Sequence, residues 1–305
     1  MASGAIKGQP ILSRRISIAF ISPSAVLIIL FLIYPFFSII SMSFTNYSLT
    51  GIHANNPDFV GFKNYTDLFT ASKWMNRGEF GASLLLSAQF VIGSALIGQA
   101  GLGMLIALIF RGKNGFLRQT VYLLAILAWI MPDVVIAFAW FAFLDPFSGT
   151  LNNILGALGL GKPDWLLHYP LLSVVVFNTW RGTAFSMLLF TSALGSIPPS
   201  YLETADVLGA SMWQKFRDIL FPLLRTTIAT DLILITMWTF NTFTPYLLTN
   251  GGPSYRTDLV AIYTYRIGLK NLEFGRGSAV AVVAMIINLC LASVYLMVSR
   301  RRRPQ

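Results

Sequence analysis

Three ionisable side chains interrupt long apolar stretches of this 305-residue sequence, and they are the first candidates for chemistry. They are Asp133, Arg181 and Asp231. A charge at the centre of a membrane helix costs about 3 kcal/mol or more, so it requires a partner, a water-filled pathway or an ion relay. The sequence therefore points to a function carried out within a membrane.

The depths of Arg181 and Asp231 in their predicted helices nearly coincide. With a rise of about 1.5 Å per residue, Arg181 lies about 17 Å below the outer end of its span, and Asp231 lies about 12 Å above the inner end of the next. In a hydrocarbon core about 30 Å thick, the two levels are similar. One hypothesis is that the two side chains pair, and the alternative is that each faces a water-filled cavity separately. Asp133 follows Pro132, where a backbone carbonyl loses its partner, and the sequence leaves a structural or a functional role open.

Aromatic and amide side chains accompany these charges. Aromatic faces and side-chain hydrogen bonds are the two kinds of contact that these residues could offer to a ligand. Trp238 and Asn241 are three residues apart and so share a helix face. In the alternative interpretation, the aromatic residues only pack or face lipid. The candidate pathway residues are Trp180, Arg181, Asp231, Trp238, Asn241 and Tyr246. Other polar residues, which are candidates for hydrogen bonds between helices, are Gln89, Gln99 and Asn288.

Residue patterns typical of enzymes are missing. His53 and His168 are the two histidines, and neither stands in a metalloprotease or carboxylate–histidine context. Cys290 is the single cysteine, which excludes a disulfide within the chain and a thiolate cluster. No G-x-x-x-x-G-K-S/T phosphate loop occurs, so this chain is not expected to bind or hydrolyse ATP. We expect a protein that is not an enzyme and carries no cofactor or metal of its own.

The composition predicts an integral membrane protein. Hydrophobic residues make up 55% of the sequence and charged residues 11%, whereas soluble domains contain about 25% charged residues. The predicted fold class is all-α with six transmembrane helices, because helices satisfy their own backbone hydrogen bonds in lipid. The predicted spans cover about residues 16–44, 82–110, 117–144, 170–194, 223–248 and 278–298.

The basic residues indicate the orientation of the chain. The net charge is +10, and lysines and arginines flank the apolar runs, which favours orientation signals over a nucleic-acid-binding surface. Their distribution predicts cytoplasmic termini at 1–15 and 300–305 around a membrane domain at 16–299. The segment 196–222 then lies in the cytoplasm. The first apolar run is too long for a signal-peptide core and is predicted to be a retained span.

The cytoplasmic segment is predicted to form two short helices. Ser200 and Glu203 match a capping box at the start of the first helix. Gly209 stands where a left-handed residue ends a helix, and Ser211 can cap the second helix. Pro222 is expected to break that second helix before the fifth span.

The two short helices would make a knob with a small apolar side formed by Leu202, Ala205 and Leu208. Such a knob suits a groove on another protein. The alternative is an interfacial helix on lipid headgroups, although the mixed charge of the segment differs from the Lys/Arg-rich character of such helices.

The same segment resembles the EAA motif, E-A-A-x3-G-x9-I-x-L-P, of the membrane subunits of bacterial and archaeal ABC importers. Thr204 and Phe221 stand where the motif has Ala and Leu, and both roughly keep the size or the apolar character of the residue replaced. In that family the loop docks in a cleft of a separate ATPase. The resemblance assigns to this contact Glu203, Thr204, Ala205, Gly209, Ile219 and Pro222.

Further stretches resemble maltose-type carbohydrate permeases. They are NTWRGTAFSMLLFTSALGSIPPSYLETA, YLLTNGGPSYRTDLVAIYTYRIG, FGRGSAVAVV and FVGFKNYTDLF. The resemblance implies a type I ABC importer fold in a bacterial or archaeal cell (inner) membrane. It also implies alternating-access transport of a carbohydrate or a polyol phosphate such as glycerol phosphate.

The resemblance implies several partners as well. A cytoplasmic ATPase dimer would bind ATP and Mg²⁺, and a homologous permease, different from this chain or a second copy of it, would complete the pathway. An extracytoplasmic sugar-binding protein would face an outer loop that is otherwise an ordinary turn. That loop contains Asn250, Gly251, Gly252 and Pro253. The competing class is a secondary transporter with a cytoplasmic interfacial helix, which predicts inverted repeats that the sequence lacks.

Overall fold

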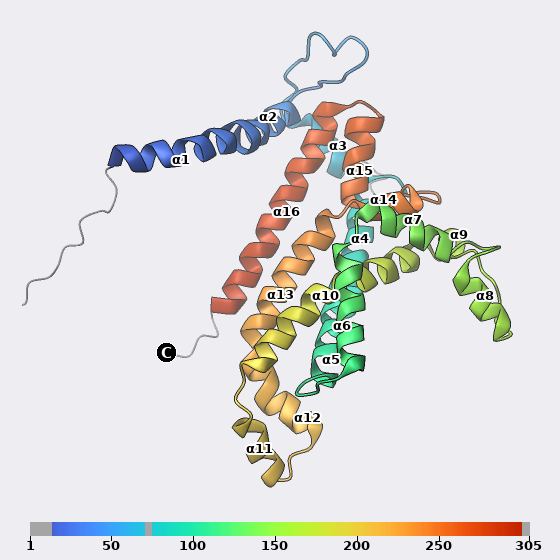
Figure 1. The fold of residues 1–305 in the computed structure, drawn as a ribbon. Helices are drawn as coiled ribbons and strands as arrows, with labels where there is room; N and C mark the ends of the chain where they lie inside the picture. Colours follow the sequence, from blue (N-terminus) through green and yellow to red (C-terminus); the bar gives the residue numbers. More distant parts are fainter. Residues whose placement is uncertain (1–13, 71–74, 301–305) are drawn as a thin grey trace, which may run out of the picture.

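The computed structural model describes residues 14–70 and 75–300, and their regular structure is helical apart from one isolated bridge between Thr45 and Phe59 (Figure 1). Residues 1–13 of the expected N-terminal tail and residues 301–305 of the basic tail lie outside the described ranges. An all-helical fold follows from the composition, because a helix leaves no backbone group unpaired in lipid.

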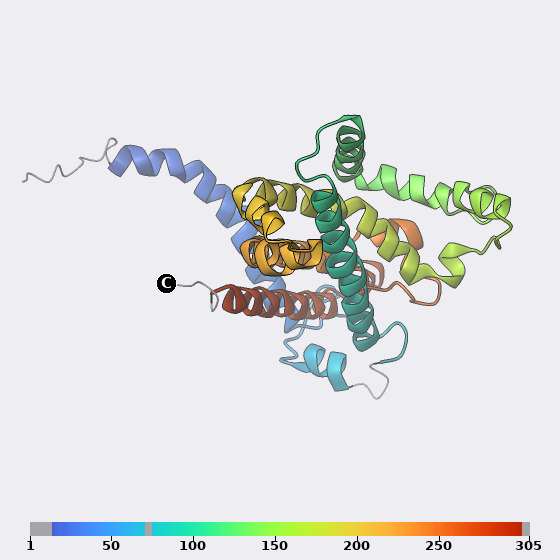
Figure 2. The ribbon, with the colours of Figure 1, turned by 90° about the horizontal axis from the view of Figure 1, so that it is seen from below.

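The first apolar segment forms one long rod. It consists of α1 (Arg14–Ile28), a π-helical turn η1 (Ile29–Ile33) and α2 (Tyr34–Ser43). Figures 1 and 2 both show α1 extending away from the other helices, whereas α2 lies against α16 (Phe274–Arg300). The most apolar window of this rod contains no buried residue, and a helix that is apolar all round is suited to lipid or to another membrane protein.

The remaining elements form a bundle with short helices at both ends. The first half contains α3 (Lys63–Thr70), α4 (Phe80–Phe90), η2 (Val91–Gln99), α5 (Ala100–Ile109), α6 (Phe116–Ile130), α7 (Asp133–Phe143), α8 (Thr150–Ala157) and α9 (Trp165–His168). The second half contains α10 (Pro170–Gly195), α11 (Ser200–Val207), α12 (Met212–Gln214), η3 (Lys215–Leu220), α13 (Phe221–Asn241), α14 (Thr244–Thr249), α15 (Val260–Tyr265) and η4 (Arg266–Lys270), followed by α16.

Four continuous helices of the described chain are long and apolar enough to cross a membrane. They are Ile18–Ser43, Phe80–Ile109, Met212–Asn241 and Phe274–Tyr295. The pair α6 and α7 gives a fifth if it is counted as one broken span. Helix α10 covers the fourth predicted span almost residue for residue and is 26 residues long, but polar residues such as Asn178 and Arg181 keep it out of this set.

The third predicted span is not a straight helix. Between α6 and α7 the axis turns by 111°, because Met131 and Pro132 are extended with ψ of 142° and 138°. Proline cannot donate the hydrogen bond that would continue the helix, and the residue before it avoids helical geometry. The span predicted over 117–144 is therefore a bent pair of helices, which passes as one span only if it is counted as broken.

The fifth predicted span, 223–248, was displaced. The helix runs without interruption from Met212 to Asn241, then breaks at Thr242, whose ψ is 135°. The sequence predicted that Pro222 ends a helix, and this prediction was wrong. The helix continues through Pro222, because the π-helical turn η3 precedes it. A wider turn relieves the crowding that a proline ring causes at the carbonyl four residues earlier. The π-helical turn η1 precedes Pro35 in the same way.

The centre of the bundle is a close crossing of α10 with η2 and α5. A Cβ atom added at Gly98 would lie 2.1 Å from Thr179 Oγ1, and one added at Gly103 would lie 2.6 Å from Ser186 Cβ. Small residues let helix backbones approach where packing, rather than the hydrophobic effect, drives association in lipid. Gln99 donates to Thr239 Oγ1 at 3.3 Å and links this crossing to α13, which confirms its predicted role between helices.

Two glycines of α5 allow a matched test of this crossing. We expect Gly103→Ala to destabilise the protein by about 1–3 kcal/mol, because the new Cβ would lie 2.7 Å from the Met187 backbone nitrogen, which cannot move aside. A Cβ added at Gly101 would meet no heavy atom within 4 Å. Gly101→Ala should therefore stabilise the protein by about 0.5–1 kcal/mol through helix propensity. Thermal unfolding of both variants in detergent measures these changes in stability. Equal shifts for the two variants would contradict the close crossing.

Candidate functional site

The two predicted cytoplasmic helices form a hairpin at one end of the molecule (Figure 1). Helix α11 ends at Gly209, which has φ of +74°, a conformation that glycine adopts without strain. The amide of Ala210 donates to the Ala205 carbonyl at 2.9 Å, and the amide of Gly209 donates to Asp206 at 3.0 Å. This pattern satisfies the last carbonyls of α11 and confirms the predicted glycine terminator.

The helix starts differ from each other. The predicted capping box of Ser200 and Glu203 is not formed, because α11 begins one residue early, with Pro199 as its N-cap and no side-chain cap. Ser211 does cap the second helix. Its amide donates to Gln214 Oε1 at 2.7 Å, and its hydroxyl accepts from the Gln214 amide at 3.3 Å. Lys215 and Asp206 form an ion pair that ties the two helices together.

The predicted apolar side of the hairpin is divided. Ala205 is buried and Leu202 is half-buried, and both lie on the membrane side, Leu202 against the cluster that contains Phe190 and Leu224. Leu208 instead is 79% exposed. It belongs to an exposed apolar tip formed by Val207, Leu208, Met212 and Trp213.

The remaining residues of the EAA motif differ in exposure. Glu203, Thr204 and Gly209 are exposed, Ile219 is half-buried, and Pro222 is exposed on the long helix. The hairpin thus presents apolar side chains with a polar rim to the solvent, a combination that a binding groove on a protein can cover.

In the membrane part, Arg181 pairs with Asp133. One guanidinium nitrogen of Arg181 donates to Asp133 Oδ1, and the other donates to Thr244 Oγ1 at 3.2 Å. The Thr244 hydroxyl donates in turn to Asp133 Oδ2 at 2.7 Å. The hypothesis that Arg181 pairs with Asp231 was therefore wrong.

Two irregular helix starts bring this polar cluster to Arg181, which lies in the middle of α10. Asp133 is the first residue of α7, directly after the bend, and Thr244 is the first residue of α14, directly after the break at Thr242. A carboxylate in the first turn of a helix is stabilised by the amide groups there. Irregular backbone at membrane depth is tolerated where it is buried in protein or lines a cavity. The cluster joins α7, α10 and α14.

Asp231 lies apart from this cluster and is fully buried. Its Oδ1 accepts from the Ser186 hydroxyl at 2.9 Å, and its Oδ2 has no hydrogen-bond partner within the described chain. Ser186 comes five residues after Arg181, which turns it about 140° around the helix axis, so α10 presents the two side chains to different neighbours. Within residues 14–70 and 75–300, no group of three or more His, Cys, Asp or Glu side chains could hold a metal ion.

The aromatic candidates belong to separate ring clusters. The ring centroids of Trp180 and Trp140 are 5.6 Å apart, and those of Trp238 and Phe185 are 4.8 Å apart in an edge-on contact. Both Trp180 and Trp238 remain substantially exposed. Tyr246 forms a third cluster, whose centroid distances to Phe243 and Tyr265 are 4.7 and 5.1 Å.

Asn241 forms a reciprocal amide pair with Asn288 of α16, with hydrogen bonds of 3.0 and 3.1 Å. The pair lines a hollow of about 420 Å³ between α13, α15 and α16. This confirms the interhelical role predicted for Asn288, whereas no hydrogen bond involves the side chain of Gln89 in the described structure, and Gln89 is exposed. The six candidate residues thus do not converge on one point, and Asp231 in particular is enclosed by packing.

The loop predicted to lie on the outer side is held firmly at its base. Asn250 and Gly251 have φ of +53° and +79°, and the Thr257 hydroxyl donates to the Gly252 carbonyl at 3.0 Å. Arg266 binds the buried carboxylate of Asp258 at 2.7 Å and also donates to the Gly78 carbonyl. Burial raises the pKa of Asp258, and the contact with Arg266 opposes that shift. The loop is therefore anchored to the start of α4.

Comparison with known proteins accounts for these features. Residues 99–304 match the family "Binding-protein-dependent transport system inner membrane component". The sulfoquinovosyl glycerol transport system permease protein SmoG of Agrobacterium fabrum is 30% identical over 95% of this chain and 92% of its own length. The trehalose/maltose transport system permease protein MalF of Thermococcus litoralis is 32% identical, with coverages of 80% and 81%.

A solved structure shares the fold. It is the crystal structure of a bacterial ABC transporter involved in the import of the acidic polysaccharide alginate, one chain of which matches with a TM-score of 0.78 and 22% identity. The match covers 95% of this chain and 96% of that one. The family match and the two relatives extend over most of the sequence, including the hairpin and the polar cluster. This chain therefore belongs to the family of inner-membrane permease components of binding-protein-dependent ABC transport systems.

Proposed function

We propose that this permease moves a carbohydrate or a related polyol derivative, with energy supplied by a separate cytoplasmic ATPase that binds ATP and Mg²⁺. The observation that carries the coupling part of the proposal is the exposed apolar tip at the EAA motif. Val207, Leu208 and Met212 are 88%, 79% and 78% exposed, which is costly unless a partner covers them. The relatives named above, which serve a sulfoquinovosyl glycerol and a trehalose/maltose system, support the substrate class.

The proposed topology has six crossings and cytoplasmic termini. Helix α10, with 26 residues and a length of about 39 Å, is long enough to be the sixth crossing beside the five recognised by composition. The hairpin and the loop at 250–253 lie toward opposite ends of the bundle (Figure 1), which fits an ATPase on one side and an extracytoplasmic binding protein on the other. A second permease subunit, homologous or identical, would complete the pathway.

The coupling route we propose is a single helix. Met212, at the exposed apolar tip, is the first residue of the continuous helix that ends at Asn241 and also carries Trp238. When the ATPase subunits close, a displacement of the exposed apolar tip is transmitted along this helix to the side chains of Trp238 and Asn241. The ion pair of Lys215 with Asp206 keeps α11 attached to the rod, so the hairpin moves as one body.

The polar cluster suits uncharged hydroxyl groups. The charge of Arg181 is already balanced by Asp133, and Thr244 adds a hydroxyl, so the cluster offers donors and acceptors without a large net charge. Trp180, the preceding residue of α10, packs its ring on Trp140 and is 42% exposed. Hydroxyl groups of a sugar both donate and accept hydrogen bonds, which matches such a set.

The exposed apolar tip gives the direct test of the coupling role. We expect Leu208→Asp/Met212→Asp to reduce recovery of a phosphate-loop ATPase with this chain by about tenfold or more, because apolar anchors dominate interface energies. The measurement is a gentle-detergent pull-down from the native membrane followed by mass spectrometry. Leu158→Asp is the matched control, since Leu158 is 69% exposed in the segment between α8 and α9. Equal recovery of the ATPase by all versions would overturn the docking role.

A double-mutant cycle tests the polar cluster. We expect Asp133→Asn and Arg181→Met each to lower the unfolding temperature, and the double variant to lose less than the sum. An interaction of about 1 kcal/mol is expected, because the Asp133 side chain is 45% exposed and solvent weakens the pair. The comparison cycle of Arg181→Met with Asp231→Asn should be additive. Additivity in the first cycle, or coupling only in the second, would contradict the pairing described above.

A further inference from the structure

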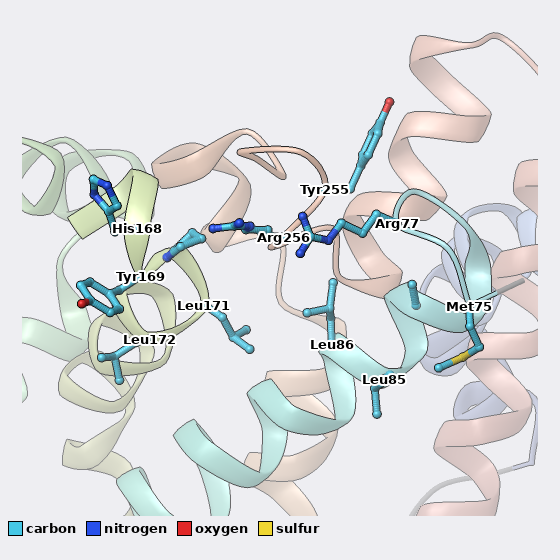
Figure 3. Close-up of a pocket in the computed structure, with 12 residues that line it drawn as sticks. Met75, Arg77, Leu85, Leu86, His168, Tyr169, Leu171, Leu172, Tyr255 and Arg256 are labelled. Atoms are coloured by element: carbon cyan, nitrogen blue, oxygen red, sulfur yellow. The ribbon is translucent and has the colours of Figure 1, made fainter. Parts of the chain in front are cut away.

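A pocket of about 450 Å³ opens on the side of the bundle where α4 and α10 begin (Figure 3). Its walls come from the start of α4, from the turn between α9 and α10 and from the loop after α14. These segments lie far from the hairpin, toward the opposite end of the molecule (Figure 1). The pocket is separate from the polar cluster, since Arg181 lies about 16 Å along α10 from Pro170.

The pocket carries positive charge without a counterion. Arg77 and Arg256 lie beside each other at its rim, and none of the twelve lining residues is acidic (Figure 3). Both arginines are exposed, and in the described ranges neither side chain has a hydrogen-bond or ion-pair partner. His168 and Tyr169 also line the pocket, but both point away from the two arginines, and His168 Nδ1 lies 3.1 Å from the Asp164 carbonyl (Figure 3).

The rest of the lining is apolar. It consists of Met75, Ala82, Leu85, Leu86, Pro170, Leu171 and Leu172, together with the ring of Tyr255. Leu85 and Leu172 are 47% and 52% exposed. They belong to the first two turns of α4 and α10, where the chain enters the membrane, so hydrocarbon chains of lipid can cover them.

We propose that this pocket binds one anionic phospholipid of the outer leaflet. The phosphate would accept hydrogen bonds from Arg77 and Arg256, while the first methylene groups of the acyl chains lie against Leu85, Leu171 and Leu172. Guanidinium groups bind phosphate with two-pronged geometry, and basic residues near the membrane surface attract anionic lipid. A soluble sugar would leave the charge unpaired, and an acidic peptide would pair with the charge but leave the leucines uncovered.

A lipid in this position would act as a structural link. It would join the start of α4, the start of α10 and the loop that carries Tyr255 and Arg256, three segments that are far apart in the sequence. Since the loop is also held at its base by the ion pair of Arg266 with Asp258, the lipid would fix its outer part. This proposal stands independently of the substrate and of the ATPase.

Native mass spectrometry of the detergent-purified chain tests the proposal. Phosphatidylglycerol and phosphatidylcholine are titrated separately, and we expect phosphatidylglycerol to saturate first at one bound lipid. The variant Arg77→Gln/Arg256→Gln should weaken that binding by about 25-fold, since each basic residue near a lipid surface contributes roughly fivefold. Lys63→Gln/Lys162→Gln is the matched control, because it removes two exposed basic side chains outside the pocket.

Two further measurements separate a lipid from other anions. Leu172→Asn should weaken the binding of both phospholipids, because it removes acyl contact and keeps the arginines. Free glycerol 3-phosphate should not displace the bound lipid at equal concentration. Displacement by glycerol 3-phosphate would overturn the lipid proposal in favour of a simple anion site. Unchanged phosphatidylglycerol binding in the double arginine variant would also overturn it, and the arginines would then be tested against an acidic protein surface.

Discussion

The guanidinium group of Arg181 imposes the constraint on which the arrangement of the membrane part depends. A cation at this depth needs a counterion, and the nearest segments of a regular bundle would present only apolar side chains. The chain meets this need with two interrupted helices. The bend before Asp133 turns α7 by 111° from the axis of α6, and the break before Thr244 starts α14 at the same place. Both interruptions free backbone groups that would be costly in lipid, so the polar cluster and the irregular backbone stabilise each other.

The helix that begins at Met212, in contrast, is not interrupted before Asn241. Here Pro222 would be expected to interrupt the helix, yet the π-helical turn before it keeps the rod continuous from the hairpin to Asn241. Close contacts then fix the neighbouring helices against it, through Gln99 with Thr239 and through Ser186 with Asp231. A rigid rod can transmit a displacement over its whole length, whereas a hinged one would absorb it. Continuity of this helix up to Asn241 and interruption at its end and between α6 and α7 are thus complementary features.

Much of the helical framework could be predicted from the sequence. The apolar run after Pro170 gave α10 within one residue, and Gly209 and Ser211 gave the hairpin turn, because these signals act locally. The partner of Arg181 could not be predicted in this way. The depth argument used only distance along the helix, whereas pairing also depends on rotation about the axis and on the bend that brings Asp133 close. A proline predicts an interruption, but not its angle. The secondary-transporter alternative is excluded by the family to which the chain belongs.

The hairpin shows how a motif can be predicted correctly while its surfaces are not. A helical pattern of Leu202, Ala205 and Leu208 indicates one apolar face, but it cannot say what that face contacts. In the structure, Leu202 and Ala205 lie on the membrane side, which leaves Leu208 to combine with Val207, Met212 and Trp213 across the Gly209 turn. The same arrangement explains why the hairpin is anchored and exposed at once. Its inner side is part of the protein core, so a force applied to the exposed apolar tip is passed to the membrane helices without being lost in the turn.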